Sequence, residues 1–255
     1  MLRKEFPILE FDDTKEAVIE PHKTIEKLNV PEYGVMCFFN DILRKFKDQG
    51  KLRTIASFKS EMGENPMYEL EYEGNKVAVF NPGVGAPLAA SVLEEAIAMG
   101  INKFIACGSA GVLNKEIAVG HIIIPTSAVR DEGMSYHYLP PGREVEANRE
   151  AVEAIKEVLK NYKYKYLISK TWTTDAFYRE TPQKVKLRRE EGCSTVEMEA
   201  AAFFAVAKFR NIKFGQILYG GDDVSCEEWD SRSYNTRNHI RENLFWLAVE
   251  ACLKL

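Results

Sequence analysis

The stretch Ser194-Thr195-Val196-Glu197-Met198-Glu199-Ala200-Ala201-Ala202-Phe203-Phe204-Ala205-Val206-Ala207 places two carboxylates directly before eight apolar residues. A membrane-spanning helix needs about 20 such residues, so this run predicts a shorter helix buried inside a globular protein. Ser194 and Glu197 have the spacing of a capping box, which predicts that the helix begins at Ser194. Glu199 would then lie near the positive end of the helix dipole, at the edge of a dry core. A carboxylate is costly there unless something binds it, so we interpret Glu199 as a ligand-binding residue, whereas Glu197 fits a cap or a ligand.

Composition indicates a cytoplasmic globular protein. The chain has 255 residues, of which 45% are hydrophobic, and this length suits one large domain or two small ones. The net charge is −4 and no basic run stands out, so nucleic acid is not an expected partner. The five cysteines are scattered without a CxxC pair, which argues against zinc and disulfides and favours a reducing compartment. Residues 1–6 lack the apolar core of a signal peptide, and no segment is long enough to cross a membrane.

Predicted strands alternate with predicted helices along the chain. Short apolar runs predict buried strands at 34–39, 55–59, 67–72, 76–81, 103–107, 120–125, 166–173 and 214–219. Capped or amphipathic segments predict helices at 42–46, 88–99, 144–162, 181–189 and 233–255. This alternation predicts a single three-layer α/β/α domain over residues 1–255, with a mixed, mostly parallel central sheet. We expect residues 1–33 to form an N-terminal arm, and the basic face of the helix at 181–189 to lie in solvent.

Several polar residues follow predicted strands, where ligands bind in open α/β sheets. Asn40 can cap the next helix, which puts Arg44 in its first turn, a place that the helix dipole disfavours for a cation unless an anion is bound. A solvated arginine explains the same position. The stretch Gly108-Ser109-Ala110-Gly111 can form a nest of N–H groups for an anion. Asp222-Asp223 follow the last predicted strand, and we expect one of these two acids to be structural.

Six short segments, in this order and spacing, resemble the nucleoside phosphorylase family that contains uridine phosphorylase, the hexameric purine nucleoside phosphorylases and the methylthioadenosine/adenosylhomocysteine nucleosidases. The segments are Asn40-Asp41-Ile42-Leu43-Arg44, Gly83-Val84-Gly85-Ala86-Pro87, Gly108-Ser109-Ala110-Gly111, Asp175-Ala176-Phe177-Tyr178, Val196-Glu197-Met198-Glu199-Ala200-Ala201 and Gly221-Asp222. The resemblance implies a pentosyltransferase, a nucleoside phosphorylase that cleaves the N-glycosidic bond of a ribonucleoside with phosphate. It implies no metal and no cofactor besides phosphate. Such proteins are homo-oligomers, either hexamers or dimers, whose subunits share sites.

The resemblance also implies roles for individual residues. Glu199 would accept hydrogen bonds from the ribose 2′- and 3′-hydroxyls, and Phe177 would pack against the base. His22 would reach from the arm into a neighbouring subunit and touch the 5′-hydroxyl. Asp222 would protonate the leaving base, with the acid after it as the other candidate, and Arg44 would act on the attacking phosphate. The residues implied for substrate are Glu197, Met198, Glu199, Phe177, Tyr178 and His22, and those implied for phosphate are Asn40, Arg44, Gly108 and Ser109.

One departure from the family pattern leaves alternatives open. Phosphorylases usually carry a further arginine at the position of Ala106, just before the Gly-Ser turn. A nucleoside hydrolase of the same fold, which uses water, is therefore one alternative. A nucleoside-binding protein without catalysis is another. Residues 129–138 look more like uridine phosphorylases than purine enzymes, so uridine-type substrates are favoured over purines.

Overall fold

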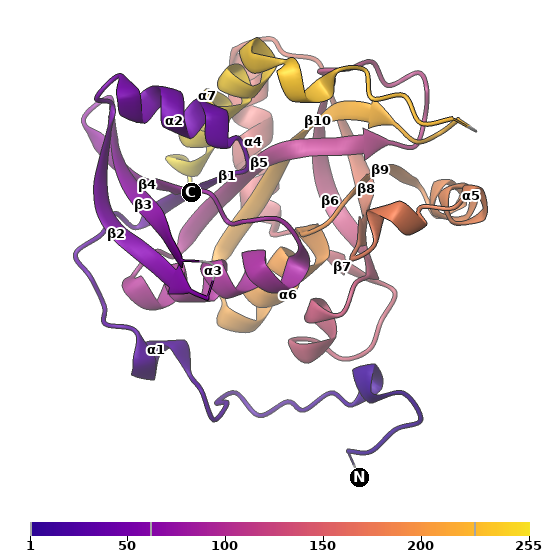
Figure 1. Ribbon diagram of the computed structural model, residues 1–255, viewed down its shortest axis with the longest axis horizontal. Helices are drawn as coiled ribbons and strands as arrows, with labels where there is room; N and C mark the ends of the chain where they lie inside the picture. The colour runs from indigo at the N-terminus through magenta and orange to yellow at the C-terminus, as the bar shows by residue number, and fades with distance from the viewer. Residues whose placement is uncertain (1, 62, 227) are drawn as a thin grey trace.

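The fold is organised around one ten-stranded β-sheet, which a computed structural model describes, with its helices, over residues 2–61, 63–226 and 228–255 (Figure 1). The strands are β1 (Tyr33–Cys37), β2 (Leu52–Ser60), β3 (Gly63–Tyr72), β4 (Asn75–Phe80), β5 (Lys103–Val112), β6 (Ile122–Asp131), β7 (Glu144–Glu146), β8 (Tyr166–Thr174), β9 (Cys193–Glu197) and β10 (Lys213–Asp223). Their order is β10-β6-β8-β9-β5-β1-β4-β3-β2, while β7 pairs with β6 and β10 also pairs with β5. The strands β5, β10, β6, β8 and β9 therefore form a closed ring, which β1 to β4 extend as an open sheet.

The sheet is mixed. Parallel pairings lie in two groups, β4-β1-β5-β10 and β6-β8-β9. Antiparallel pairings of β10 with β6 and of β5 with β9 join the two groups into the ring. The remaining antiparallel pairings add β3, β2 and β7. The predicted α/β fold with a mixed sheet is confirmed.

Helices cover both faces of the sheet. They are α1 (Pro21–Thr24), α2 (Asn40–Asp48), α3 (Ala86–Met99), α4 (Arg149–Asn161), α5 (Pro182–Glu190), α6 (Ala200–Arg210) and α7 (Asn238–Cys252), with short 3-10 helices η1 (Pro7–Leu9), η2 (Met134–His137), η3 (Phe177–Arg179) and η4 (Tyr234–Thr236). Helices α2, α4 and α7 pack on one face, and α3 and α6 on the other (Figure 1). Each face carries its own core: the first core lies under α2, α4 and α7, and the second core lies under α3 and α6. Because alternate residues of a strand face opposite sides, Val35 packs in the first core and Met36 in the second. Among the helices described, none is long and apolar enough to cross a membrane.

The helix in the central stretch begins later than its capping-box spacing predicts. Ser194 lies in β9 and α6 begins at Ala200, so the predicted start at Ser194 is wrong. Sheet pairing competes with the helix here, because β9 pairs with both β5 and β8. Glu197 nevertheless caps α6, since its Oε2 accepts hydrogen bonds from the N–H groups of Glu199 and Ala200 at 2.8 and 2.7 Å.

Other predicted boundaries are also wrong. Asn40 is the first residue of α2 rather than its cap. The helix predicted at 144–162 begins at Arg149, because the residues before it pair with β6 as β7. Residues 108–111 and 222–223 lie within β5 and β10 rather than beyond them, because these two strands pair with each other through this length.

The N-terminal arm packs against α3 and α6 (Figure 1). Glu20 is buried, and its carboxylate lies 3.2 Å from a guanidinium nitrogen of Arg210 at the end of α6. The N–H of Leu28 donates to the carbonyl of Met99 at the end of α3, at 2.9 Å. These contacts attach the arm to the second core.

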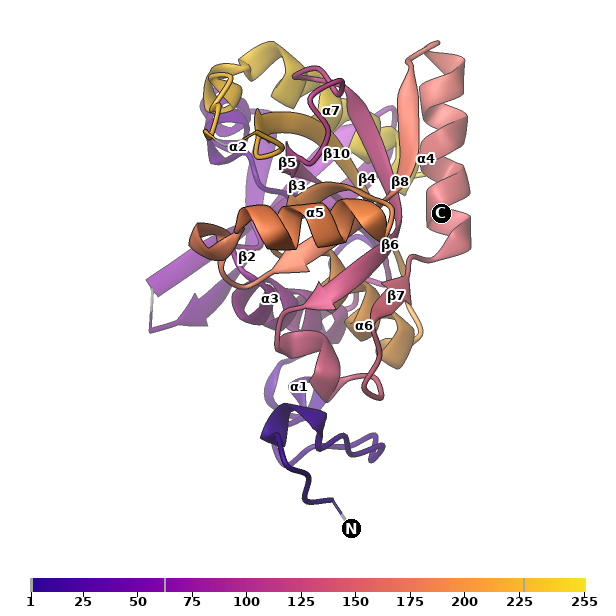
Figure 2. The same cartoon turned by 90° about the vertical axis from the view of Figure 1, so that its right-hand side faces the viewer.

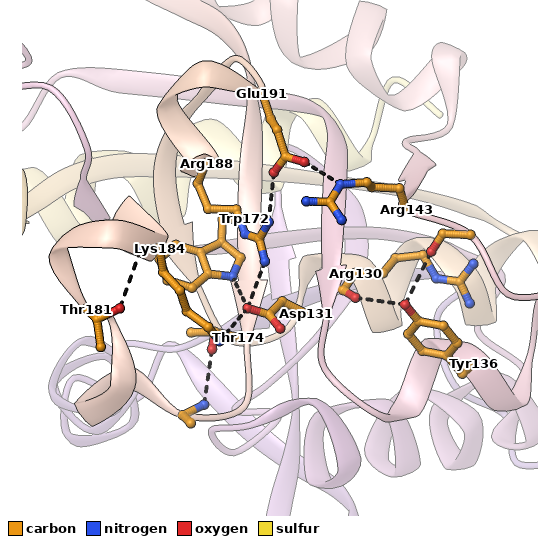
Figure 3. Close-up of polar contacts among 12 residues, drawn as sticks. Arg130, Asp131, Tyr136, Arg143, Trp172, Thr174, Thr181, Lys184, Arg188 and Glu191 are labelled. Atoms are coloured by element: carbon orange, nitrogen blue, oxygen red, sulfur yellow. Dashed lines mark hydrogen bonds and ion pairs between the residues drawn. The ribbon is translucent and has the colours of Figure 1, made fainter. Parts of the chain in front are cut away.

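A network of ion pairs fixes α5 beside the sheet (Figures 2 and 3). Asp131 of β6 accepts hydrogen bonds from Lys184 Nζ and Arg188 Nη2 at 3.0 and 3.1 Å, and from the indole of Trp172 at 3.0 Å. Arg188 is buried and also donates to Glu191 at 2.8 Å, so the expectation that the basic face of α5 lies in solvent is wrong for this residue. Burial alone would raise the pKa of Asp131, but Lys184 and Arg188 outweigh it, and the pKa is lowered.

Replacing Asp131 by alanine is expected to lower the free energy of unfolding by about 3 kcal/mol, because a buried guanidinium loses one of its two acidic partners. Thermal denaturation measures this change. Replacing the exposed Glu190 of the same helix is the matched control and should cost less than about 1 kcal/mol. The pKa of Asp131 is lowered on folding, so its contribution is present above its ordinary pKa and is lost as the pH falls through the lowered value. Equal losses in the two variants would mean that the network does not hold α5.

Candidate functional site

A cavity of about 890 Å³ lies at the carboxyl ends of β5, β9 and β10. In α/β sheets this end of the strands is where ligands bind. Most of the residues implied by sequence line this cavity, although they come from separate elements. They are Gly108, Ser109, Phe177, Tyr178, Glu197, Met198, Glu199 and Asp222.

Glu199 is the N-cap residue of α6 and lines the cavity. The residue is 5% exposed, and its Oε1 accepts a hydrogen bond from the N–H of Gly85 at 2.6 Å. Gly85 has φ of 97°, a backbone conformation that favours glycine, and it precedes α3. The turn before α3 therefore supplies a backbone donor to the buried carboxylate of Glu199.

Glu197 holds the turn on which Glu199 stands. Its Oε1 accepts the hydroxyl of Thr173 at 2.6 Å, while Oε2 accepts the two N–H groups at the start of α6. Burial raises the pKa of Glu197, and these donors offset part of the rise. Burial also raises the pKa of Glu199, and the neighbouring charge of Glu197 adds to it, whereas the N–H of Gly85 opposes it. Because both of its oxygens bond within the protein, Glu197 acts as a positioning residue for Glu199.

The two acids at the end of β10 have different surroundings. Asp223 is 3% exposed, forms an ion pair with Arg232 and accepts the N–H of Ser225 at 2.8 Å. Asp222 lines the cavity, and its Oδ2 accepts the indole N–H of Trp229 at 2.7 Å. Asp223 is therefore engaged in holding the chain after β10, while Asp222 faces the ligand space.

A second carboxylate lies close to Asp222. Glu180 follows η3, whose Phe177 and Tyr178 rings lie 4.0 Å apart between centroids and are both exposed. Glu180 also lines the cavity. Burial raises the pKa of Glu180 to about 7, and the negative charge of Asp222 contributes to the rise. This part of the cavity thus combines aromatic rings with two acids.

Another group of polar residues lines the cavity around Ser109. Arg241, in the first turn of α7, is one member, and Tyr219 of β10 and Asn235 of η4 are others. The hydroxyl of Tyr219 donates to the carbonyl of Tyr234 at 2.8 Å. Here the cavity offers hydroxyl and guanidinium groups, in contrast to the acids beside η3.

Three of the residues implied by sequence do not line the cavity. His22 lies on α1, where its Nδ1 is 3.4 Å from a carboxylate oxygen of Glu20 and its side chain is 58% exposed. Asn40 and Arg44 are both exposed on α2. Within this single chain, the implied phosphate ligands are therefore reduced to Gly108 and Ser109.

Sequence reasoning missed several residues that line the cavity, namely Glu180, Gln216, Trp229 and Arg241. Arg241 is the fourth residue of α7, but a helix predicted to start at residue 233 hides this position near the helix N-terminus. Glu180 stands just before the helix cap Thr181 and reads as an ordinary solvated acid. Trp229 lies in an irregular segment, where no periodicity indicates which way a side chain points.

Across residues 2–61, 63–226 and 228–255, no group of three or more His, Cys, Asp or Glu side chains is placed to hold a metal ion. The described residues of the cavity lining offer carboxylates, hydroxyls, amides, an indole, a thiol and one guanidinium. Such groups suit a polar organic ligand and an anion.

The chain is similar to known proteins in sequence and in fold. Residues 32–253 match the family model described as the phosphorylase superfamily. The chain is 27% identical to guanosine phosphorylase of Halorubrum lacusprofundi over 237 residues, covering 87% of this chain and 93% of that protein. It is 30% identical to uridine phosphorylase of Thermococcus kodakarensis over 208 residues, covering 73% and 75%. The structure of AMP nucleosidase from Bacteroides thetaiotaomicron matches with a TM-score of 0.71 and 22% identity, covering 88% and 87% of the two chains.

Proposed function

Because this chain belongs to the phosphorylase superfamily, we propose that it is a nucleoside phosphorylase, which converts a ribonucleoside and phosphate to a free base and ribose 1-phosphate. The observation that carries the proposal is the buried carboxylate of Glu199, held at the start of α6 against a cavity that also contains Asp222 and Ser109. A carboxylate is a strong acceptor for two neighbouring hydroxyls, such as those of ribose. Inorganic phosphate is the co-substrate, and the proposal requires no other cofactor.

Glu199 acts on the sugar. As phosphate attacks C1′, the glycosidic bond breaks and positive charge develops on the ribosyl ring. A carboxylate bound to the 2′- and 3′-hydroxyls stabilises that charge more than it stabilises the neutral substrate, which lowers the barrier. Met198, next to it, lines the cavity with an apolar side chain that can cover one face of the sugar. Holding sugar and phosphate together supplies a further entropic advantage.

Asp222 acts on the leaving base. The base departs with negative charge, so a proton donor must reach it. Asp222 faces the cavity, and its bond to the indole of Trp229 fixes its carboxyl group in one orientation. The rings of Phe177 and Tyr178 lie beside the same space and can stack on the base.

We propose a purine with hydrogen-bond donors on its edge as the base, in place of the uridine-type base that the sequence favours. Uracil presents one ring N–H between two carbonyl oxygens, and carbonyl oxygens are poor neighbours for carboxylates. Guanine presents N1–H and an amino group together, which a carboxylate accepts well. Glu180 lines the cavity beside the two rings of η3, and because Asp222 serves as the proton donor, Glu180 is the acid left to accept these groups. The choice rests on this acid, since the relatives include proteins named guanosine phosphorylase and uridine phosphorylase alike.

The pH dependence of guanosine cleavage tests the role of Glu180. Burial and Asp222 raise the pKa of Glu180 to about 7, so its carboxyl group is neutral below that pH and becomes an acceptor above it. The kcat/KM for guanosine is therefore expected to rise between about pH 6 and pH 8, since kcat/KM follows the ionisation of the free enzyme. In Glu180→Gln the guanosine profile should become like the uridine profile, which keeps only the ionisations that both substrates need, such as that of Glu199. An unchanged guanosine profile in Glu180→Gln would exclude Glu180 from base recognition.

One experiment separates phosphorolysis from hydrolysis and from nucleoside binding without catalysis. A nucleoside hydrolase releases base equally well with and without phosphate, and a binding protein shows affinity without turnover. The test is incubation with a panel of purine and pyrimidine nucleosides, with and without phosphate, followed by measurement of free base and ribose 1-phosphate. We expect release of base and ribose 1-phosphate in equal amounts, only with phosphate. Equal release without phosphate would contradict the proposal.

We also propose that the protein works in the cytoplasm as a homo-oligomer, a hexamer or a dimer, with sites shared between subunits. Exposed apolar side chains at the mouth of the cavity support this assembly, because Tyr178 is 87% exposed and Val84 and Trp229 are also uncovered in the single chain. In such an assembly the exposed His22 is the residue that would approach a neighbouring site. Analytical ultracentrifugation tests the proposal, and a monomer at active concentrations would contradict it.

A further inference from the structure

We infer that Arg241, on the C-terminal helix, supplies the positive charge that binds the phosphate co-substrate, in the role that the sequence assigned to Arg44. The inference rests on the proposed function, because it names the anion ligand of the same site. Among the described residues that line the cavity, Arg241 is the only lysine or arginine. Arg44 is exposed on α2 outside the lining, and Ala106 is fully buried and carries no charge.

The guanidinium of Arg241 is held in place but is not saturated. Its Nη2 lies 2.7 Å from a carboxylate oxygen of Asp41, and Nη1 donates to the carbonyl of Asn235 at 2.8 Å. The guanidinium carbon lies 4.8 Å from the centroid of the Phe39 ring. The Nε atom is buried and has no hydrogen-bond partner within the described part of the chain. That nitrogen has almost no accessible surface and does not face the cavity, but each Nη atom carries a second N–H beyond the bonds above, and 15% of the side chain remains exposed.

The surroundings of Arg241 suit an anion. Ser109 also lines the cavity, and the phenol of Tyr219 is close enough to both residues for the Ser109 hydroxyl and the Arg241 charge to act on it. Arg241 stands in the first turn of α7, a helix of 15 residues whose N-terminal N–H groups favour negative charge. A cation in that turn is unfavourable on its own. A guanidinium and a serine hydroxyl together provide donors that a phosphate needs.

A purely structural role is the competing explanation. The ion pair with Asp41 connects α7 to α2, and Arg241 would be retained for that contact alone. That role does not account for the exposed part of the side chain in the cavity wall. Asp41 is 41% exposed, so its pair with Arg241 is partly screened by solvent and leaves the guanidinium able to bind a second anion.

The test compares the phosphate dependence of four variants with that of the wild type. In Arg241→Gln, the KM for phosphate is expected to rise at least tenfold, while the KM for nucleoside changes less than about twofold. Arg241→Lys, which keeps the charge, should recover part of the phosphate affinity and guards against loss of folding in the glutamine variant. Arg237→Gln removes an exposed arginine one turn earlier, outside the cavity, and should behave as the wild type. Asp41→Asn breaks the interhelical ion pair, and it should raise the KM for phosphate less than Arg241→Gln does.

Two results would overturn the inference. One is an Asp41→Asn variant that reproduces the full effect of Arg241→Gln, because Arg241 would then act only through the helix contact. The other is an Arg44→Gln variant that raises the KM for phosphate while Arg241→Gln does not. Melting curves provide a readout without turnover, since phosphate should raise the melting temperature of the wild type and not of Arg241→Gln. If the wild type cleaves nucleosides without using phosphate, the proposed function fails, and the melting shift still decides the role of Arg241.

Discussion

Replacing Glu199 by glutamine is expected to lower kcat/KM for nucleoside cleavage at least hundredfold. Glutamine has nearly the same shape and can still accept the N–H of Gly85, but it has no negative charge to stabilise the developing ribosyl cation. A hundredfold loss corresponds to about 2.7 kcal/mol of transition-state stabilisation. Steady-state kinetics with a good nucleoside substrate measures it. A variant with wild-type rates would remove Glu199 from the site.

The stability of the same variant is the control for folding. The pKa of Glu199 is raised in the folded protein, mainly by burial and also by the charge of Glu197. The contribution of this carboxyl group to stability is therefore fully present below its ordinary pKa and is lost as the pH rises through the raised value. Glu199→Gln should be as stable as the wild type at low pH and more stable at alkaline pH. A variant that is inactive and also unstable at alkaline pH would mean that Glu199 has a structural role.

Replacing Asp222 by asparagine is expected to lower kcat/KM for purine nucleosides about hundredfold, and for pyrimidine nucleosides much less. A general acid of this kind contributes about 10²-fold or more, and asparagine cannot deliver a proton. Asparagine can still accept the indole N–H of Trp229, so the orientation of the side chain is kept. The kinetics of both substrate classes are compared in one preparation of each enzyme.

Asp223→Asn is the matched control for Asp222. Asp223 pairs with Arg232 away from the cavity lining, so its replacement should reduce thermal stability with a smaller effect on kcat/KM. Equal and negligible effects of Asp222→Asn on purines and pyrimidines would reassign the acid. A large kinetic loss in Asp223→Asn with unchanged stability would make that residue the acid instead.

The α/β class and the buried position of Glu199 at the start of a helix could be predicted from sequence, because both depend on local patterns. Buried strands read as short apolar runs, and a carboxylate directly before an apolar run is conspicuous wherever the helix begins. The start of α6 could not be predicted, because Ser194 belongs to a strand that pairs with β5, far away in the chain. The closed ring of strands depends on the same long-range pairing.

The polar lining of the cavity was the least predictable part. Arg44 and Arg241 both lie near the start of a helix, yet only Arg241 lines the cavity. The direction of each side chain is set by how α2 and α7 pack on the sheet, which no local pattern records. Glu180 and Asp222 come from different elements, so their proximity, and its effect on the pKa of Glu180, follows only from the fold.

Phosphorolysis itself is tested most directly by the source of the oxygen on C1′ of the sugar product. The reaction is run with unlabelled phosphate in water enriched in oxygen-18, and the sugar is examined by mass spectrometry as it forms. Attack by phosphate predicts ribose 1-phosphate without label, in an amount equal to the free base. Labelled free ribose as the first product would show that water attacks C1′, and would contradict the assignment of this protein as a nucleoside phosphorylase.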